Sequence, residues 1–170
     1  MSLYEVSVPQ FTKMLRQLET WLDKGVAHAT AKKFEPANLL AARLAPDMYP
    51  LTRQIQAACD AAKFAGARLT GKEPPKNPDT ETTIDELRAR IHSTIAFLGT
   101  LTAKDFDGAE KRMVPLSFMP GKGLHGADYL VEMALPNFYF HLTTAYAILR
   151  HNGVDVGKID YVGGLTLQDV

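Results

Sequence analysis

The sequence predicts an all-α four-helix bundle, and three observations lead to this fold class. Four segments carry apolar residues at a spacing of about 3.6 residues, as amphipathic helices do. Proline- and glycine-rich stretches separate these segments, and no part of the chain has the alternation that predicts an extended sheet. Residues 1–170 are expected to form a single domain, because domains commonly hold about 100–200 residues.

The first helix is expected from about Pro9 to Ala29. Pro9 is acceptable in a first turn, because its missing N–H would have no partner there in any case. The apolar stripe that predicts this helix consists of Phe11, Leu15, Leu18, Leu22 and Val26.

The second helix is expected to begin near Asp47 or Tyr49, with Pro50 in its first turn, and to stop at Gly71. Small residues in its stripe would let a neighbouring helix approach closely. The stripe consists of Leu51, Ile55, Ala58, Ala62, Ala65 and Leu69. The connector from Gly71 to Asp79 holds three prolines, which cannot continue a helix.

The third helix has the clearest start signal. Thr83 and Glu86 match a capping box, in which each side chain satisfies a backbone N–H of the first turn. The apolar period continues to near Thr102.

A long crossover over residues 103–126 is expected between the third and fourth helices, and a short β-hairpin within it is one interpretation. The fourth helix is predicted from about Ala127 to Asn152. Pro136 removes the N–H that would bond the Glu132 carbonyl, which predicts a kink. Residues 154–170 are expected to form an irregular tail over the bundle.

Composition excludes several classes of function. Nineteen Lys and Arg balance nineteen Asp and Glu, so no nucleic-acid partner is expected. No apolar stretch reaches the ~18 residues of a membrane span, and the first residues do not resemble a signal peptide. The one cysteine, Cys59, cannot form an intrachain disulfide, which is typical of a reducing compartment. The prediction is a cytoplasmic protein.

The residues that could carry chemistry lie on the fourth helix. Asn137 and His141 are four apart, so they lie one above the other on one helix face. Ala134, Phe138 and Ala145 share this face, which predicts that it points inward. Such a pair can build a metal site in a bundle core. The alternative is a purely structural role, in which a buried histidine is hydrogen-bonded to a neighbour.

At this point the sequence resembles a known family, the DinB/YfiT-like superfamily of metal-dependent four-helix bundles. The closer resemblance is to a branch of it described as a domain of unknown function. The segments that carry the resemblance span nearly the whole chain and are Leu44–Leu51, Ala58–Asp60, Leu135–His141, Thr143–Tyr146 and Leu149–Gly153.

The resemblance implies a divalent metal, since in that superfamily a His-x-x-x-His pair on the last helix and a third His on the second helix hold one. His141 falls on the second histidine of the pair, but Asn137 stands where the first would be. No histidine lies on the second helix, so Asp47 is the expected replacement, with Asp60 as the other nearby carboxylate. Neutral amides are poor ligands for zinc or nickel, so the implied site for zinc, nickel or manganese is incomplete.

Two further residues are candidate ligand-binding positions. His125 opens the fourth helix, where it could line a pocket or simply cap the helix, and Tyr146 follows His141 on the same helix. Aromatic residues cover more than one face of this helix, which predicts either a homodimer contact or a lid formed by the crossover and tail. These aromatic residues are Tyr129, Phe138, Tyr139, Phe140 and Tyr146.

Three hypotheses of function follow. The first is a homodimeric bundle that binds a small molecule through His141 and Asn137, without a complete metal site. The second, implied by the resemblance, is a metal-dependent transferase or hydrolase, with a thiol-linked reaction as one version and the metal near His141. The third makes the pair a purely structural buried hydrogen bond. A carboxylate facing His141 from the second helix would favour the enzyme, and alanine or leucine there would favour the binder.

Overall fold

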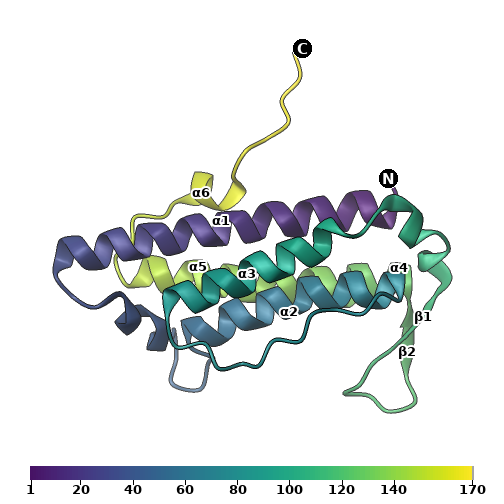
Figure 1. The fold of residues 1–170 in the computed structure, drawn as a ribbon, viewed down its shortest axis with the longest axis horizontal. Helices are drawn as coiled ribbons and strands as arrows, with labels where there is room; N and C mark the ends of the chain where they lie inside the picture. The colour runs from purple at the N-terminus through teal and green to yellow at the C-terminus, as the bar shows by residue number, and fades with distance from the viewer. Residues whose placement is uncertain (170) are drawn as a thin grey trace.

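Four long helices pack side by side in the computed structural model, which describes residues 1–169 (Figure 1). They are α1 (Leu3–Lys32), α2 (Leu51–Thr70), α3 (Ile84–Gly99) and α5 (Leu135–His151). Around the bundle, α1 packs on α3 and α5, and α2 packs on the same two helices. The predicted four-helix bundle is confirmed.

Shorter elements connect and cover the four helices. The helical ones are η1 (Pro36–Ala41), η2 (Ala103–Phe106), η3 (Ala109–Lys111), α4 (Gly126–Asp128), η4 (Tyr129–Ala134) and α6 (Lys158–Val162). Strands β1 (Met113–Pro115) and β2 (Gly123–His125) pair in antiparallel register, with Val114 opposite Leu124. This confirms the β-hairpin in the crossover, and Figure 1 shows it projecting from one end of the bundle.

Helix α1 begins earlier than the sequence analysis predicted. Ser2 and Glu5 form a capping box, with the Glu5 N–H donating to Ser2 Oγ at 3.3 Å and the Ser2 N–H donating to Glu5 Oε2 at 2.7 Å. Pro9 therefore lies inside the helix instead of in its first turn. The cap decides the start, because it satisfies N–H groups that would otherwise lack partners.

Helix α2 begins later than predicted, at Leu51, with Pro50 as its N-cap. A residue that precedes proline is disfavoured in the α conformation, so Tyr49 cannot join the helix. Asp47 consequently lies in a turn and not on the helix stripe. The predicted apolar stripe from Leu51 to Leu69 is fully buried, and Gly71 closes the helix with a φ of 78°, as predicted.

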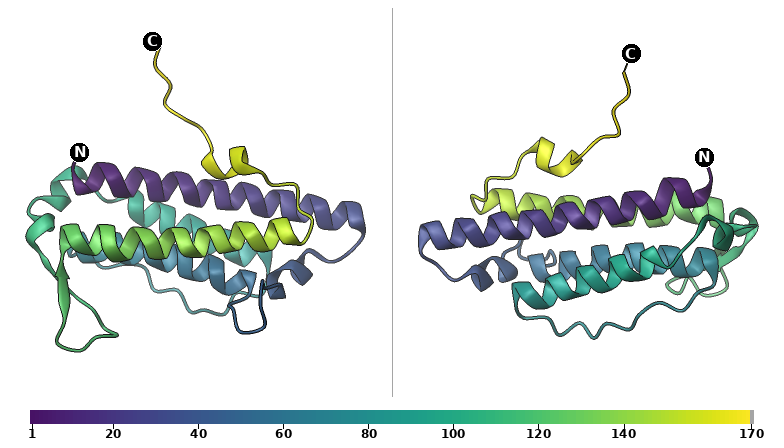
Figure 2. Two further views of the ribbon diagram at one scale, coloured as in Figure 1. Left: turned by 180° about the vertical axis from the view of Figure 1, so that it is seen from behind. Right: turned by 45° about the horizontal axis from the view of Figure 1, so that its top comes forward.

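The proline-rich segment after α2 runs back along the length of the bundle. Figures 1 and 2 show it in extended form, returning from the end of α2 to the start of α3. Helices α2 and α3 therefore run in the same direction, opposite to α1 and α5. Helix α3 starts with the predicted capping box, in which the Glu86 N–H donates to Thr83 Oγ1 at 3.2 Å.

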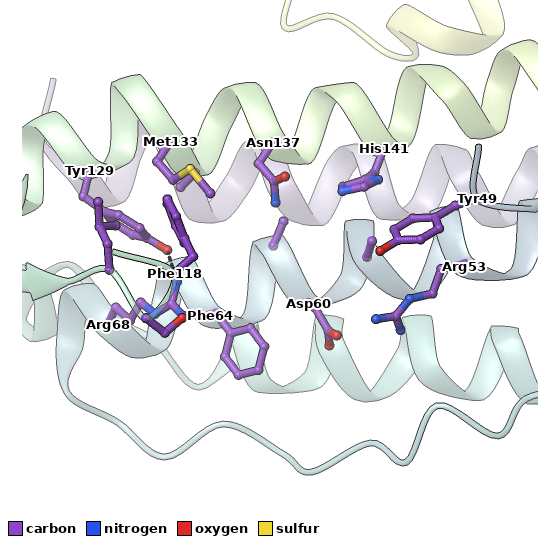
Figure 3. A pocket seen from close by; sticks show the side chains of 15 residues that line it. Tyr49, Arg53, Asp60, Phe64, Arg68, Phe118, Tyr129, Met133, Asn137 and His141 are labelled. Atoms are coloured by element: carbon purple, nitrogen blue, oxygen red, sulfur yellow. Dashed lines mark hydrogen bonds between the residues drawn. The ribbon is translucent and has the colours of Figure 1, made fainter. Parts of the chain in front are cut away.

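Just before Pro136, where a kink is predicted, the structure has a π-helical segment, η4, that leads directly into α5. Pro136 lacks the N–H that a continuous α-helix needs, and a π-turn is one way to accommodate the missing bond. The segment aims Tyr129 and Met133 toward α2 (Figure 3).

Only the first part of the segment predicted as an irregular tail covers the core: residues 154–162 lie on the bundle and include the short helix α6, whereas residues 163–169 run away from it (Figures 1 and 2). Trp21 is fully buried, its ring stacks 5.4 Å from that of Tyr161, and its Nε1 donates to the Asp160 carbonyl at 3.1 Å. Tyr146 packs edge-on against both rings. Much of the aromatic surface of the last helix is therefore covered by this chain itself. Among residues 1–169, no helix is both long and apolar enough to cross a membrane.

Candidate functional site

A pocket of about 300 Å³ lies between α2, the last helix and the hairpin (Figure 3). Two stripes of side chains at helical spacing form its walls. From α2 they are Arg53, Ala57, Asp60, Ala61, Phe64 and Arg68, and from η4 and α5 they are Tyr129, Met133, Ala134, Asn137 and His141. Tyr49 and the hairpin residues Leu116, Ser117 and Phe118 complete the lining. The volume is at the lower end of the range typical of small-molecule sites, roughly 300–1,000 Å³.

His141 is half-buried and held in one orientation by Gln54 of α2. The Gln54 amide nitrogen donates to the Tyr49 carbonyl at 3.2 Å, which turns the amide oxygen toward His141. His141 Nδ1 lies 2.8 Å from this oxygen, so Nδ1 carries the proton and donates. Burial, and then the positive charge of Arg53, lower the pKa of His141. The ring is therefore neutral near pH 7, with the Nε2 lone pair available.

Asn137 stands one turn from His141 on the pocket wall (Figure 3). Neither its side-chain amide nor His141 Nε2 hydrogen-bonds to a protein group in residues 1–169. Polar groups inside a protein normally have a hydrogen-bond partner. For these two groups, a ligand or water can supply that partner. The sequence correctly grouped these two residues, but it did not identify Gln54 as the partner of His141.

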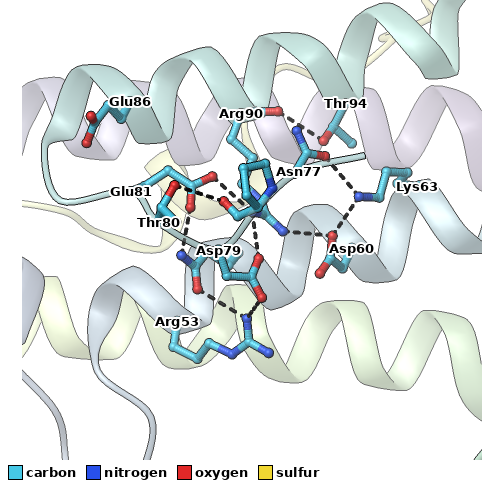
Figure 4. A network of polar contacts seen from close by, with 12 residues as sticks. Arg53, Asp60, Lys63, Asn77, Asp79, Thr80, Glu81, Glu86, Arg90 and Thr94 are labelled. Atoms are coloured by element: carbon cyan, nitrogen blue, oxygen red, sulfur yellow. Dashed lines mark hydrogen bonds and ion pairs between the residues drawn. The ribbon is translucent and has the colours of Figure 1, made fainter. Parts of the chain in front are cut away.

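The polar end nearest His141 is built on ion pairs shared with α3 and the connector (Figure 4). Asp60 Oδ1 accepts from Lys63 Nζ at 2.9 Å and from Arg90 Nη2 at 2.8 Å. Arg90 also pairs with Asp79 at 2.8 Å and with Glu81 at 2.9 Å. Asp60, the second carboxylate considered from the sequence, does line the pocket, but one of its oxygens already serves two cations.

The opposite end of the pocket is formed by Arg68 and Tyr129. Arg68 Nη1 donates to the Tyr129 hydroxyl at 2.9 Å. The guanidinium carbon lies 5.4 Å from the Phe64 ring centroid and 5.7 Å from that of Tyr129, which is cation–π distance. Phe118 from the hairpin turn stands beside this group (Figure 3).

Three predicted site residues lie outside this pocket lining. Asp47 is exposed in the turn before α2. Tyr146 donates to the Val156 carbonyl at 3.2 Å and packs under the tail. His125 is exposed at the end of β2, with Nδ1 3.1 Å from the Lys111 carbonyl. Asp47 lies outside the pocket because α2 starts after it, and Tyr146 lies outside because it packs under the folded-back tail.

The donors present do not fit a tightly held divalent metal. Among the described residues, no three His, Cys, Asp or Glu side chains come together as a metal-binding cluster. His141 offers the one imidazole of the pocket, its neighbour is a neutral amide, and Arg53 places a positive charge close by. Transition metals at such sites require stronger donors than these. The metal site that the resemblance implies stays a prediction.

The two arginines of the pocket and most of its aromatic wall were not predicted from the sequence. A signal was present, because Arg53, Ala57, Ala61, Phe64 and Arg68 recur at helical spacing beside the buried stripe of α2. The spacing predicts a second face of α2 but not which element lies opposite it. These residues line a pocket only because α5 lies opposite.

Comparisons with known proteins agree with this architecture. Residues 3–162 match a family described as a domain of unknown function, DUF1993. A crystal structure of a DinB family member protein from Shewanella denitrificans is similar, with a TM-score of 0.96 and 46% sequence identity. That similarity covers 99% of this chain and 96% of the other. No curated protein matches the sequence.

Proposed function

The chain belongs to the DUF1993 family and has the fold of a DinB family member, and from this premise we propose that it binds a small organic molecule in the pocket between α2 and α5. One observation carries the proposal. His141 Nε2 and the Asn137 amide have no hydrogen-bond partner among residues 1–169, and both lie on the wall of a preformed pocket. Polar groups that converge beside apolar side chains in a preformed cavity are typical of a ligand site.

The side chains opposite His141 favour a binder over a metal-dependent enzyme. The group that contacts His141 from α2 is the neutral amide of Gln54, and not a carboxylate. Ala57 and Ala61 leave space on the α2 wall, which a ligand can fill. His141 then accepts a hydrogen bond through Nε2, and Asn137 donates or accepts one beside it.

A fragment screen by ligand-observed NMR tests this proposal. Wild type is compared with Ala61→Phe, which fills the pocket, and with Ala27→Phe, which places the same ring on an exposed site of α1. We expect fragments that bind wild type and Ala27→Phe but not Ala61→Phe. Asn137→Leu, which removes polar atoms without adding a ring, is expected to weaken the same fragments. Equal binding to wild type and Ala61→Phe would overturn the proposal, as would an absence of hits.

The metal-dependent transferase or hydrolase has its own measurement. Wild type and His141→Ala are dialysed against zinc, nickel and manganese and then against metal-free buffer. Elemental analysis then gives the equivalents of metal that each protein retains. We expect neither protein to keep close to one equivalent, because the donor set is incomplete. Retention by wild type and loss in His141→Ala would favour the enzyme instead.

The homodimer is also a proposal. Of the aromatic residues that predict it, Phe140 is the one left largely exposed, at 55%. Light scattering of the purified protein measures the mass directly. A mass of twice the monomer supports the dimer, and the monomer mass contradicts it.

A further inference from the structure

Arg68 is placed rigidly, although it lies at an exposed position of α2. The hydrogen bond to the Tyr129 hydroxyl holds one nitrogen, while the Phe64 and Tyr129 rings hold the guanidinium plane. Tyr129 is itself 2% exposed, so its ring cannot swing away. An arginine that has already lost its freedom pays little further entropy when it binds a partner.

The charge on Arg68 has no acidic partner in the part of the chain that the structure describes. The other charged side chains around the pocket form a balanced network of three cations and three carboxylates. These are Arg53, Lys63 and Arg90 with Asp60, Asp79 and Glu81. No ion pair to Arg68 occurs within residues 1–169. This end of the pocket therefore carries one positive charge that none of the described carboxylates pairs with.

Hydrogen-bond donors gather at the same end. A guanidinium has five N–H groups, and Tyr129 accepts from one nitrogen of Arg68, which leaves other donors unused. The Tyr129 hydroxyl accepts from Arg68, so its own proton is free to be donated. Farther along the same wall, toward His141, the Asn137 amide offers another N–H (Figure 3). Charged donors of this kind bind carboxylate and phosphate oxygens more strongly than neutral ones do.

Apolar surface lies beside these donors. Phe118 is 62% exposed and Phe64 is 36% exposed, and both line the pocket. Figure 3 shows the Phe118 ring beside Tyr129 and Met133, close to Arg68. A planar apolar group placed there would remove these rings from water, and that burial is favourable.

We infer that the ligand of this pocket is an organic anion, with a carboxylate or phosphate group paired to Arg68 beside Tyr129 and an apolar body packed against Phe64 and Phe118. The inference rests on the proposed ligand pocket and adds the chemical class of what it binds. Arg53 marks the opposite end, fifteen residues away along α2, or roughly 22 Å at the α-helical rise. Because Arg53 is already paired to Asp79, it does not compete for the anion.

Matched probe compounds test the inference. Dissociation constants for 3-phenylpropionate, its neutral amide and 2-phenylethyl phosphate are measured by NMR titration at low salt. Wild type is compared with Arg68→Gln, with Tyr129→Phe, and with Arg16→Gln, which removes a positive charge from an exposed position on α1. We expect at least one anion to bind tenfold or more tightly than the amide. Arg68→Gln should abolish that preference, Tyr129→Phe should reduce it, and Arg16→Gln should leave it unchanged.

The outcomes separate this inference from the proposal beneath it. If the amide binds as tightly as both anions, and Ala61→Phe blocks its binding, the pocket binds neutral molecules and the inferred anionic ligand is wrong. If the anions bind but Arg68→Gln has no effect, the assignment of Arg68 is wrong. If no probe binds, the inference is overturned, while hits from the fragment screen still support the pocket. Preference for the propionate or for the phosphate decides which anion the site takes.

Discussion

Arg90 of α3 donates to Asp60 of α2 at 2.8 Å, and the same guanidinium joins this pocket residue to the returning connector (Figure 4). The Arg90 side chain is 1% exposed and also pairs with Asp79 and Glu81 from the connector. These acidic partners hold Arg90 in its charged form, and its pKa is raised. The extended segment thus stays against the bundle through a buried cation.

Removal of this cation should be costly. Arg90→Ala leaves three carboxylates without their shared partner, and breaking a buried ion pair in this way costs about 3–5 kcal/mol of unfolding free energy. Urea denaturation followed by circular dichroism measures the loss. Arg88→Ala is the comparison on the same helix, since Arg88 pairs with the exposed Asp23 and Asp85. Exposed pairs contribute about 0–1 kcal/mol, so similar losses in the two variants would contradict the prediction.

Gly126 allows the crossover to approach the last helix closely. A Cβ added at Gly126 would lie 2.0 Å from the Ala109 carbonyl oxygen, which is backbone and cannot simply rotate away. Gly126→Ala should therefore destabilise the fold by roughly 1–3 kcal/mol, as overpacking does. The matched control is Gly99→Ala in α3, where the added carbon would have no atom within 4 Å apart from its chain neighbours and the backbone of its own helix. Thermal unfolding of the two variants tests this prediction. Equal unfolding midpoints would contradict the close approach of Gly126 to the Ala109 carbonyl.

Trp21 reports on the position of the tail, because it is the one tryptophan of the chain. Tyr161→Ala removes the ring stacked on Trp21 and opens that face to water. We expect a red-shifted tryptophan emission and a loss of about 1–2 kcal/mol, since aromatic pairs and buried apolar area each contribute at this scale. The conservative variant Tyr161→Phe should keep the stacking and most of the stability. An unchanged emission maximum in Tyr161→Ala would show that the tail does not cover Trp21.

The ionisation of His141 makes a pH-dependent prediction. Its folded-state pKa is lowered by burial and by Arg53, so below about pH 6.5 the unfolded chain binds more protons at this site than the folded chain does. Stability should therefore fall as the pH drops through that value, and His141→Gln should remove this part of the decline. Urea titrations of both proteins at pH 7.5 and pH 5.5 measure the difference. A wild type that gained stability relative to His141→Gln on acidification would contradict the lowered pKa.

Cys59 belongs to the packed core and does not line the pocket. It is fully buried between α2 and α3, and burial raises the pKa of its thiol to about 12. A protonated thiol in such a place is a packing residue and not a nucleophile. The pocket chemistry therefore does not involve it.

The sequence by itself determined the helices and where most of them end. The buried stripe of α2, its close at Gly71 and the Thr83–Glu86 cap of α3 were all readable, because these signals act within a few residues along the chain. The same locality explains the errors. The α1 cap at Ser2 was overlooked, and Pro50 delayed the start of α2, which displaced Asp47 from the predicted site.

Tertiary structure decided the pocket. His141 meets Gln54 across 87 positions of sequence, and Arg68 meets Tyr129 across 61. Neither pairing follows from periodicity, since it depends on how α2 and α5 are rotated and shifted against each other. That arrangement comes from the packing of the whole core and from the returning connector. Local pattern therefore predicted the inward face of α5, and only the packed bundle showed which side chains it faces.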